Sequence, residues 1–445
     1  MPHAPDTLAR QRKKSRYNHR SRLALQTALE SVPAYRHWQT RDPGPSHGID
    51  TRYAAMPALE KKDLRVHTPR AFTLPGRSVD QGLSRGEIEL VKTSGTTEEQ
   101  VTNIWYQPWW DASEQASWQL NNATRAAATG AHREAILTNP VCAGMRDDEQ
   151  PLSMAARRLK RFLFLNEQSN PLHWNDSHQN RMVRELQEFQ PDILEANPSF
   201  LAKLARFIAR HKLKPYQPKA IVLTYELPSL LHQRDIQTVF CAPIVSSHGS
   251  TETGYVFMQC EHGNFHQNTE FCRVDFQPLK PEHGGPALGR LLVTTFQNPW
   301  YTLVRFDIGD LGRLYPHGDC PCGRTEGLTL SDIEGRWRCA TQTVDGRIVT
   351  SRRTDRLISM FPEIIEYKLI QHSGDAYRLH IVSPRVSRRK LGRDLCRNLR
   401  RLYGKKARIE LLFESALAPE ASGKYQLTRG VMPAEIEPFL DQRYQ

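Results

Sequence analysis

Short apolar runs alternate with helix-like patterns in the middle of the chain, between residues 193 and 245. Apolar runs bounded by turn residues are typical of buried strands, and apolar residues three and four positions apart are typical of helices. The pattern predicts strands at residues 193–194, 220–224 and 242–245, a helix opened by Pro198 and a helix at 229–240. Strands that alternate with helices favour a mostly parallel sheet, so the expected fold class is α/β.

The same patterns extend on both sides of this region. Upstream they predict a helix over roughly residues 10–32, strands at 87–92, 134–138 and 162–165, and a tryptophan-rich helical stretch around 109–118. Near Gly335 the pattern changes to short strands and turns, followed by a basic helix over 387–408 with leucines on one face. We therefore expect a large N-terminal domain of residues 1–334, with mostly parallel sheets and helices, and a small α+β C-terminal domain of residues 335–445.

The segment His-Gly-Ser-Thr-Glu follows the last strand of the alternating region, where the sequence predicts that the strand gives way to a loop. In α/β proteins, ligands bind outside the carboxyl ends of the strands. Glu252 offers carboxylate oxygen, a ligand that suits Mg²⁺. His248 can lay its ring against a flat heterocycle, and Gly249 permits close approach of the backbone. Together with Ser250 and Thr251, these residues form the first part of the expected site.

Three further segments carry residues suited to the same chemistry. A loop of hydroxyl side chains and close backbone N–H groups, which suit phosphate oxygens, follows the expected strand at 87–92: Thr93, Ser94, Gly95, Thr96 and Thr97. Downstream, Phe-Asp-Ile-Gly-Asp ends at Asp310, and Ser-Gly-Lys ends at Lys424. Taken alone, an aspartate after glycine is typical of a turn, and Lys424 is one of many lysines.

In this order and spacing, these segments resemble the motifs of the acyl-adenylate-forming enzymes, which include acyl-CoA synthetases, peptide-synthetase adenylation domains and luciferases. The closer resemblance is to the phenylacetate–CoA ligase branch. It lies in Met-Pro-Ala-Leu-Glu-Lys-Lys-Asp-Leu at 56–64, in Cys-Pro-Cys-Gly-Arg at 320–324 and in the pair Gly335-Arg336. The resemblance covers the chain from about residue 25 to residue 428.

The resemblance implies an ATP site, a hinge between the two domains and a role for each matching residue. It places Asp310 at the ribose hydroxyls, Glu226 in the lining of the nucleotide and acyl pocket, and Arg336 at the entry to the hinge. Lys424 becomes the cation that bridges the attacking carboxylate and the α-phosphate, where preorganised charge is most effective. The implied cofactors are ATP and Mg²⁺, with coenzyme A as the simplest acyl acceptor.

Two positions depart from the family pattern. Glu98 stands where the family has a glycine after the second threonine, Glu99 follows, and no lysine comes soon after. Negative charge beside a triphosphate is expected to weaken its binding. At the hinge, the family's acidic residue or lysine is replaced by Cys339. These departures keep open the alternative of a catalytically degenerate, nucleotide-binding relative.

Cysteine and histidine residues form a second constellation. Four soft or borderline ligands, the set that a tetrahedral structural zinc prefers, come from two separate segments: Cys260, His266, Cys320 and Cys322. His262 is the less favoured histidine. The single residue between Cys320 and Cys322 differs from the usual spacing of two, so free buried thiols remain the alternative.

Composition places the chain among ordinary globular proteins, with 445 residues, 39% hydrophobic and 24% charged. It has no apolar run as long as a membrane span and no N-terminal signal-peptide pattern, which predicts a cytoplasmic location in which the 8 cysteines are reduced. The net charge of +13 suits acidic partners such as nucleotides or coenzyme A. Residues 387–401 carry no aromatic side chain for base stacking, so specific nucleic-acid binding is not expected. The oligomeric state, a dimer included, stays open.

The sequence as a whole predicts an ATP-dependent ligase that activates a carboxylic acid as acyl-AMP and transfers the acyl group to a thiol. The branch resemblance favours a modest aromatic or hydroxylated carboxylic acid, aromatic before hydroxylated, as the small-molecule substrate and coenzyme A as the acceptor. The alternative within the same chemistry is a biosynthetic enzyme that passes the acyl group to an amine, a hydroxyl or a carrier-protein thiol.

Overall fold

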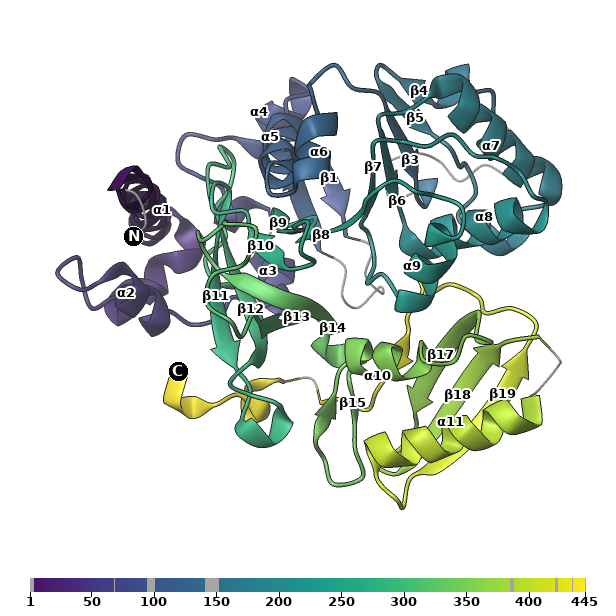
Figure 1. Ribbon diagram of the computed structural model, residues 1–445. Helices are drawn as coiled ribbons and strands as arrows, with labels where there is room; N and C mark the ends of the chain where they lie inside the picture. Colours follow the sequence, from purple (N-terminus) through teal and green to yellow (C-terminus); the bar gives the residue numbers. More distant parts are fainter. Residues whose placement is uncertain are drawn as a thin grey trace.

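The computed structural model describes residues 4–67, 69–93, 101–140, 152–384, 388–420, 423–433 and 435–444. Within this part of the chain, twelve strands form one large sheet, four form a separate C-terminal sheet, and two two-stranded sheets lie between other elements. Figure 1 shows the large sheet across the upper part of the molecule and the C-terminal sheet below it.

The predicted alternation of strands and helices forms one half of the large sheet. Five neighbouring strands run parallel: β5 (Phe162–Phe164), β3 (Glu134–Leu137), β6 (Ile193–Ala196), β7 (Ala220–Leu223) and β8 (Ile244–Ser250). The helices that connect or cover them are α7 (Asp176–Phe189), α8 (Pro198–Arg210) and α9 (Leu230–Gln237). β4 (Arg158–Leu159) adds an antiparallel edge beside β5. The prediction of an α/β region is confirmed here.

The other half of the large sheet is antiparallel, which corrects the expectation of a mostly parallel sheet. Its strands are β9 (Gly254–Gln259), β10 (Phe265–Gln267), β11 (Cys272–Pro278), β12 (Leu288–Thr295), β13 (Phe306–Leu314) and β14 (Thr329–Arg336). Several of these strands follow one another after short connections without a helix, and such connections join antiparallel neighbours only.

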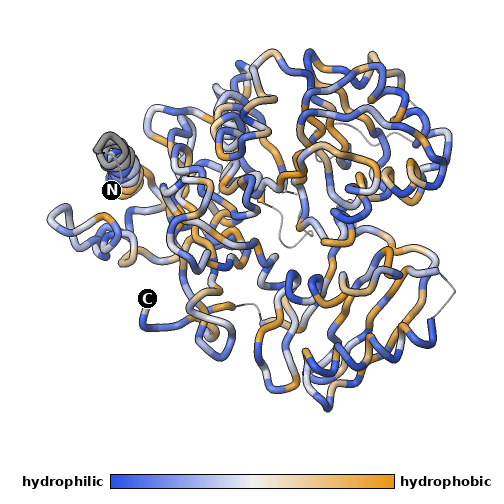
Figure 2. The backbone as a smooth tube through the Cα atoms, viewed as in Figure 1, coloured by the Kyte–Doolittle hydropathy of each residue, from blue (hydrophilic) through white to orange (hydrophobic). Residues whose placement is uncertain are grey.

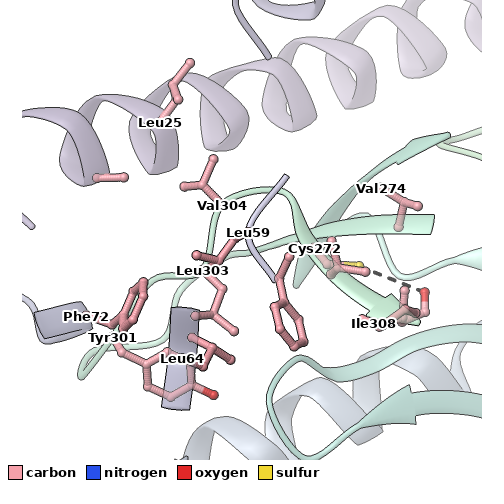
Figure 3. Close-up of a cluster of buried hydrophobic side chains, with 14 of the residues drawn as sticks. Leu25, Leu59, Leu64, Phe72, Cys272, Val274, Tyr301, Leu303, Val304 and Ile308 are labelled. Carbon is pink, nitrogen blue, oxygen red and sulfur yellow. Dashed lines mark hydrogen bonds between the residues drawn. The ribbon is translucent and has the colours of Figure 1, made fainter. Parts of the chain in front are cut away.

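N-terminal helices cover this antiparallel half. They are α1 (Ala4–Ser31), η1 (Pro33–Arg41), α2 (Ile49–Ala55), α3 (Lys61–His67), η2 (Arg70–Phe72) and α4 (Val79–Ser84). Figure 3 shows Leu25 of α1 above Val304, with further apolar side chains stacked beneath them. Leu25 and Val304 are both 0% exposed, so the predicted N-terminal helix is confirmed and forms part of the main core.

A small hairpin and two helices link this region to the parallel half. The hairpin consists of β1 (Glu89–Lys92) and β2 (Thr102–Trp105), and the helices are α5 (Gln107–Trp118) and α6 (Asn122–Ala127). The predicted strand at 87–92 and the tryptophan-rich helix are confirmed. Trp118 of α5 is fully buried, so the tryptophans of this stretch serve in part as core residues.

The C-terminal sheet has the order β19-β18-β17-β20. Its strands are β17 (Glu366–Gln371), β18 (Ala376–Val382), β19 (Arg408–Glu414) and β20 (Thr428–Arg429), and its helices are α10 (Ser351–Ile358) and α11 (Arg388–Tyr403). Leu391, Leu395 and Leu399 of α11 are buried, whereas the outer side of this helix is hydrophilic (Figure 2). The prediction of a basic helix with a leucine face is confirmed.

The segment between the sheets and the end of the chain both contact the large sheet. η7 (Trp337–Cys339) follows β14, and β15 (Thr341–Gln342) pairs with β16 (Ile348–Val349). Near the C-terminus, Leu440 forms a β-bridge with Leu279, the residue after β11. Residues of the predicted C-terminal domain therefore return to pack on the predicted N-terminal domain.

α9 forms one of the contacts between the large and the C-terminal sheets, and it lies above β17 in Figure 1. Leu231 of α9 is buried in the apolar core of the C-terminal sheet. Asp355 of α10 accepts hydrogen bonds from Ser229 Oγ at 2.6 Å and from Leu230 N at 2.8 Å. Asp355 thus caps the start of α9 from the other side of the interface. Of the described helices, none is long and apolar enough to cross a membrane.

Candidate active site

His248 and Asp310, 62 residues apart, meet at one edge of the large sheet. Nε2 of His248 lies 3.1 Å from Oδ2 of Asp310, and both side chains are largely buried. β8 runs on to Ser250, with a register shift between His248 and Gly249. The expected break of this strand into a loop before His248 is therefore wrong: the ladder with β9 extends the strand beyond the apolar run, which is something that local apolarity does not encode.

Gly249 has a structural reason to be glycine. A Cβ on this residue would lie 2.2 Å from the carbonyl oxygen of Gly254 in β9. The close approach that glycine permits here is thus the approach of β8 to β9, which sets the bulge beside His248. The expected close approach to a ligand stays a prediction.

Arg336 is the cross-strand neighbour of Asp310. The two residues are Cα partners in the antiparallel ladder of β13 and β14. Burial alone would raise the pKa of the Asp310 carboxyl, but the hydrogen bond from His248 and the charges of Arg336 and Lys61 lower it below its usual range. Asp310 is therefore ionised at neutral pH and can accept hydrogen bonds from hydroxyl groups.

Glu252 lies in the turn that joins β8 to β9, with 2% of its surface exposed. Lys61 Nζ stands 3.4 Å from its Oε1. Burial would raise the pKa of Glu252, but Lys61, a hydrogen bond from Ser250 and the charge of Arg336 outweigh burial and lower that pKa. Among the described residues, no donor makes a well-directed hydrogen bond to this oxygen. A buried carboxylate that stays ionised beside Lys61 offers the oxygen ligand that a hard divalent cation prefers.

The backbone of the same turn is fixed from two sides. Asn103 of β2 donates its side-chain N–H to the carbonyl of Thr251 at 2.8 Å, and Tyr301 donates its hydroxyl to the carbonyl of Glu252 at 2.7 Å. Ser250 Oγ lies 2.9 Å from Thr253 Oγ1. These bonds hold the Glu252 carboxylate in place without using its oxygens.

The predicted phosphate loop is described only at its first residue. Thr93 is buried and pairs with Val101: its hydroxyl accepts from Val101 N at 3.0 Å, and its own N–H donates to the Val101 carbonyl at 3.0 Å. Thr93 thus closes the base of the loop. Ser94, Gly95, Thr96 and Thr97 lie outside the described residues, as do Glu98 and Glu99.

The segment that carries Lys424 is docked on the large sheet. A Cβ on Gly423, whose φ is +77°, would lie 2.1 Å from Nδ2 of Asn139, the buried residue two positions after β3. Tyr425 N donates to Oε2 of Glu226 at 2.8 Å. The charge of Lys424 reaches Glu226, where it opposes the rise in pKa that burial causes. Lys424 is therefore held between two contacts at the edge of the sheet that also carries His248.

The four predicted zinc ligands form a cluster, with one ligand atom of each within 4.8 Å of all the others. Cys260 and Cys320 have their sulfurs 3.8 Å apart, and Cys322 Sγ lies 3.1 Å from His266 Nε2. With Zn–S bonds of about 2.3 Å, two sulfurs of a tetrahedron stand about 3.8 Å apart. His266, the histidine that the sequence analysis favoured, belongs to the cluster, while His262 is exposed. The residues fit zinc, and the metal itself remains a prediction.

Sequence reasoning missed Lys61 and Asn139 as parts of this site. Lys61 lies in the segment 56–64, which was used only as a mark of the phenylacetate–CoA ligase branch. Lys61 stands at the start of the short helix α3. In the sequence alone, such a lysine cannot be distinguished from a surface lysine. Asn139 follows the predicted strand at 134–138, at the edge where ligands bind, and that position could have identified it.

Comparisons with known proteins bear on the fold. No protein-family model matches the chain. A segment of 203 residues, 45% of this chain, is 24% identical to Protein CapK of Staphylococcus aureus, and the match spans only 44% of that protein. Among solved structures, 2-hydroxyisobutyryl-CoA ligase in the postadenylation state, in complex with R3-HIB-AMP, matches 98% of this chain and 93% of its own, with a TM-score of 0.69 and 17% identity. This chain has the fold of the acyl-adenylate-forming enzymes.

This likeness agrees, at the level of the fold, with the resemblance that the sequence motifs indicated. The same 2-hydroxyisobutyryl-CoA ligase with 2-HIB-AMP and CoA in the thioesterification state matches with a TM-score of 0.55 and 17% identity, over 95% of this chain and 90% of its own. The phenylacetate–CoA ligase branch, the hinge, the domain bounds 1–334 and 335–445 and the individual site residues stay predictions.

Proposed function

We propose that this protein is an ATP-dependent, AMP-forming ligase that activates a carboxylic acid as acyl-AMP. One observation carries the proposal: four segments far apart in sequence bring Lys61, His248, Glu252, Asp310 and Arg336 together at one sheet edge, to which the Lys424 segment is docked. A degenerate, non-catalytic protein would have little reason to keep a buried, ionised Glu252.

Each residue has a stated part in the first half-reaction. A carboxylate oxygen of the substrate attacks the α-phosphorus of ATP, a new P–O bond forms, and the bond to pyrophosphate breaks. Asp310 accepts from the ribose hydroxyls, Arg336 and Lys61 offset negative charge, and Lys424 lies between the two reacting anions. Mg²⁺, held by Glu252, would neutralise phosphate charge when bound.

In the second half-reaction a thiolate attacks the acyl carbonyl, and AMP leaves. We propose an aromatic carboxylic acid as the substrate and coenzyme A as the acceptor, as in the phenylacetate–CoA ligase branch. The likeness to a 2-hydroxyisobutyryl-CoA ligase supports a small acid and coenzyme A. Transfer to an amine, a hydroxyl or a carrier-protein thiol is the alternative acceptor chemistry.

The test is exchange of labelled pyrophosphate into ATP across a panel of carboxylic acids. With Mg²⁺ and the matching acid we expect acid-dependent exchange, and with coenzyme A we expect the acyl thioester as product. Binding of ATP without exchange for any acid, aromatic or aliphatic, would contradict the proposal and favour the degenerate relative. Pyrophosphate exchange without thioester formation would indicate that the acyl acceptor is an amine, a hydroxyl or a carrier-protein thiol.

Replacing Glu252 with glutamine is expected to lower turnover at least tenfold and to raise the Mg²⁺ concentration needed for half-maximal exchange. The amide keeps the size of the side chain but removes the negative charge that attracts the cation. Titration of exchange activity against Mg²⁺ measures both effects. The matched control is Glu87→Gln, since Glu87 is an exposed glutamate away from the cluster. An unchanged Mg²⁺ requirement in the Glu252→Gln variant would show that Glu252 is not a magnesium ligand.

We further propose that Cys260, His266, Cys320 and Cys322 hold a structural zinc. The cluster joins the end of β9 and β10 to the loop between β13 and β14; Cys260 and Cys320, whose sulfurs lie 3.8 Å apart, are 60 residues apart in the sequence. Thr329 Oγ1 lies 3.4 Å from His266 Nδ1 and can orient the ring. Such a metal would brace the antiparallel half of the sheet, whose β13 and β14 carry Asp310 and Arg336.

A further inference from the structure

Glu226 bridges the large sheet and the segment that carries Lys424. Its Oε1 accepts from Ser199 N at 3.0 Å, and its Oε2 accepts from Tyr425 N at 2.8 Å. Ser199 lies in the first turn of α8, where free N–H groups and the helix dipole favour a carboxylate. Both oxygens of Glu226 are thus already engaged by backbone amides of the protein.

The chain before Glu226 is built to aim this side chain. Tyr225 has a φ of +74°, a conformation that L-residues other than glycine rarely adopt. Its ring is directed inward, where its hydroxyl donates to Glu195 of β6. The sharp turn at Tyr225 ends β7 and leaves Glu226 facing α8 and the C-terminal segment.

The same sheet edge carries the reacting groups. β7 and β8 are parallel neighbours with Leu223 opposite Ser246, so the residues that follow β7 emerge beside His248. On the other side, a Cβ on Gly335 would lie 3.2 Å from a methyl group of Leu227. Glu226 therefore stands between the His248 and Arg336 sides of the site and holds the residue directly after Lys424.

We infer that Glu226 is a positioning residue for Lys424: its bond to Tyr425 N fixes the lysine segment on the large sheet for acyl-adenylate formation. This inference rests on the proposed function and gives Glu226 a role other than the nucleotide contact that the sequence predicted. The segment packs closely against Asn139 at Gly423, before the lysine, and is hydrogen-bonded to Glu226 at Tyr425, after it.

The first test is independent of catalysis and uses hydrogen exchange of the backbone amides in residues 423–427. Glu226→Ala removes the acceptor of the Tyr425 N–H, so exchange in this peptide should become faster by about tenfold or more while the core strands stay protected. Glu226→Gln keeps one acceptor oxygen and should give a smaller effect. Unchanged exchange in Glu226→Ala would overturn the inference.

The matched control is Glu366→Ala. Glu366 of β17 pairs with Arg206 of α8 at 2.5 Å across the same interface, and its charge also acts on the Tyr425 side chain. Its loss weakens the contact between the sheets but leaves the acceptor of the Tyr425 N–H, Glu226, in place. Faster exchange of 423–427 in Glu366→Ala, equal to that in Glu226→Ala, would mean that the segment follows general opening of the interface, and the inference would fail.

The second test is a double-mutant cycle in pyrophosphate exchange. Glu226→Ala should lower kcat about tenfold with little change in the KM for ATP, and should cost nothing further in a Lys424→Ala background, because Glu226 acts through the lysine. Acyl transfer from a supplied acyl-adenylate should be retained. Additive losses, or a raised KM for ATP at unchanged kcat, would instead make Glu226 an independent nucleotide contact.

The two tests separate this inference from the proposed function. If no acid supports pyrophosphate exchange in the unmodified protein, the ligase proposal fails, and hydrogen exchange alone then decides whether Glu226 anchors the segment. If pyrophosphate exchange is found but hydrogen exchange of 423–427 does not respond to Glu226→Ala, the ligase proposal stands and the anchor fails.

Discussion

Replacing Lys424 with alanine is expected to lower acyl-adenylate formation by about a hundredfold or more, or about 2.7 kcal/mol in the transition state. Attack of a carboxylate on the α-phosphorus brings two anions together, and a fixed ammonium group between them offsets their repulsion. Pyrophosphate exchange measures this half-reaction. Acyl transfer from a supplied acyl-adenylate should remain close to normal, because the lysine is not needed once the phosphorus bond to pyrophosphate has broken.

The structure supports Lys424 over the other lysines because its segment is fixed before and after it. Glu420 N donates to the Lys424 carbonyl at 2.9 Å, and Tyr425, the residue after Lys424, donates its N–H to Glu226. Lys405→Ala is the matched control, since Lys405 lies in an exposed turn of the C-terminal sheet. Equal loss in both half-reactions, or no loss in either, would show that Lys424 is not the adenylation cation.

Removal of the predicted zinc is expected to produce the largest effect on stability. We expect about one zinc per chain by metal analysis. Chelation should lower the melting temperature by roughly 4 °C, the shift that about 3 kcal/mol produces in a domain of about 330 residues. The reason is that metal-binding energy is available only to the folded arrangement, in which four ligands from two segments meet.

Two cysteine variants distinguish a zinc site from buried thiols. Cys320→Ser should abolish zinc binding and reproduce the loss of stability. Cys241→Ser is the control, because Cys241 is an exposed free cysteine outside the cluster. A metal-free protein with an unchanged melting temperature would identify the four residues as ordinary thiols and an imidazole.

Local hydrophobic patterns were sufficient to predict the helices and strands that bury one face. The alternation from β6 to β8 and the leucine face of α11 were predicted because burial of apolar side chains imposes a period of its own on each element. The same reasoning predicted that the strand ends at residue 245, whereas β8 extends to Ser250. Its last residues are polar, and they extend the strand only because β9 returns alongside it.

Residue types and resemblance to known motifs also predicted the residues of the candidate sites from the sequence. The cysteines and His266 were predicted to share a site because soft ligands cluster around zinc, and the structure brings them together. Glu252 and Asp310 were chosen by resemblance to known motifs, and the structure places both at one sheet edge with Lys61. The sequence could not distinguish Lys61 from a surface lysine, because its partner lies 191 positions away, from 61 to 252.

The sequence by itself therefore determined the fold class, the order of its elements in the α/β region and the residue types of the candidate site. Only the tertiary structure decided that half of the large sheet is antiparallel, that Asp310 faces Arg336 across a ladder, and that Glu226 holds Tyr425. The physical reason is that sequence patterns reflect local interactions, whereas the tertiary structure depends on contacts between distant segments. Periodicity records the burial of a single element, whereas ladder register, ion pairs and docking contacts depend on which distant segments the chain topology makes neighbours.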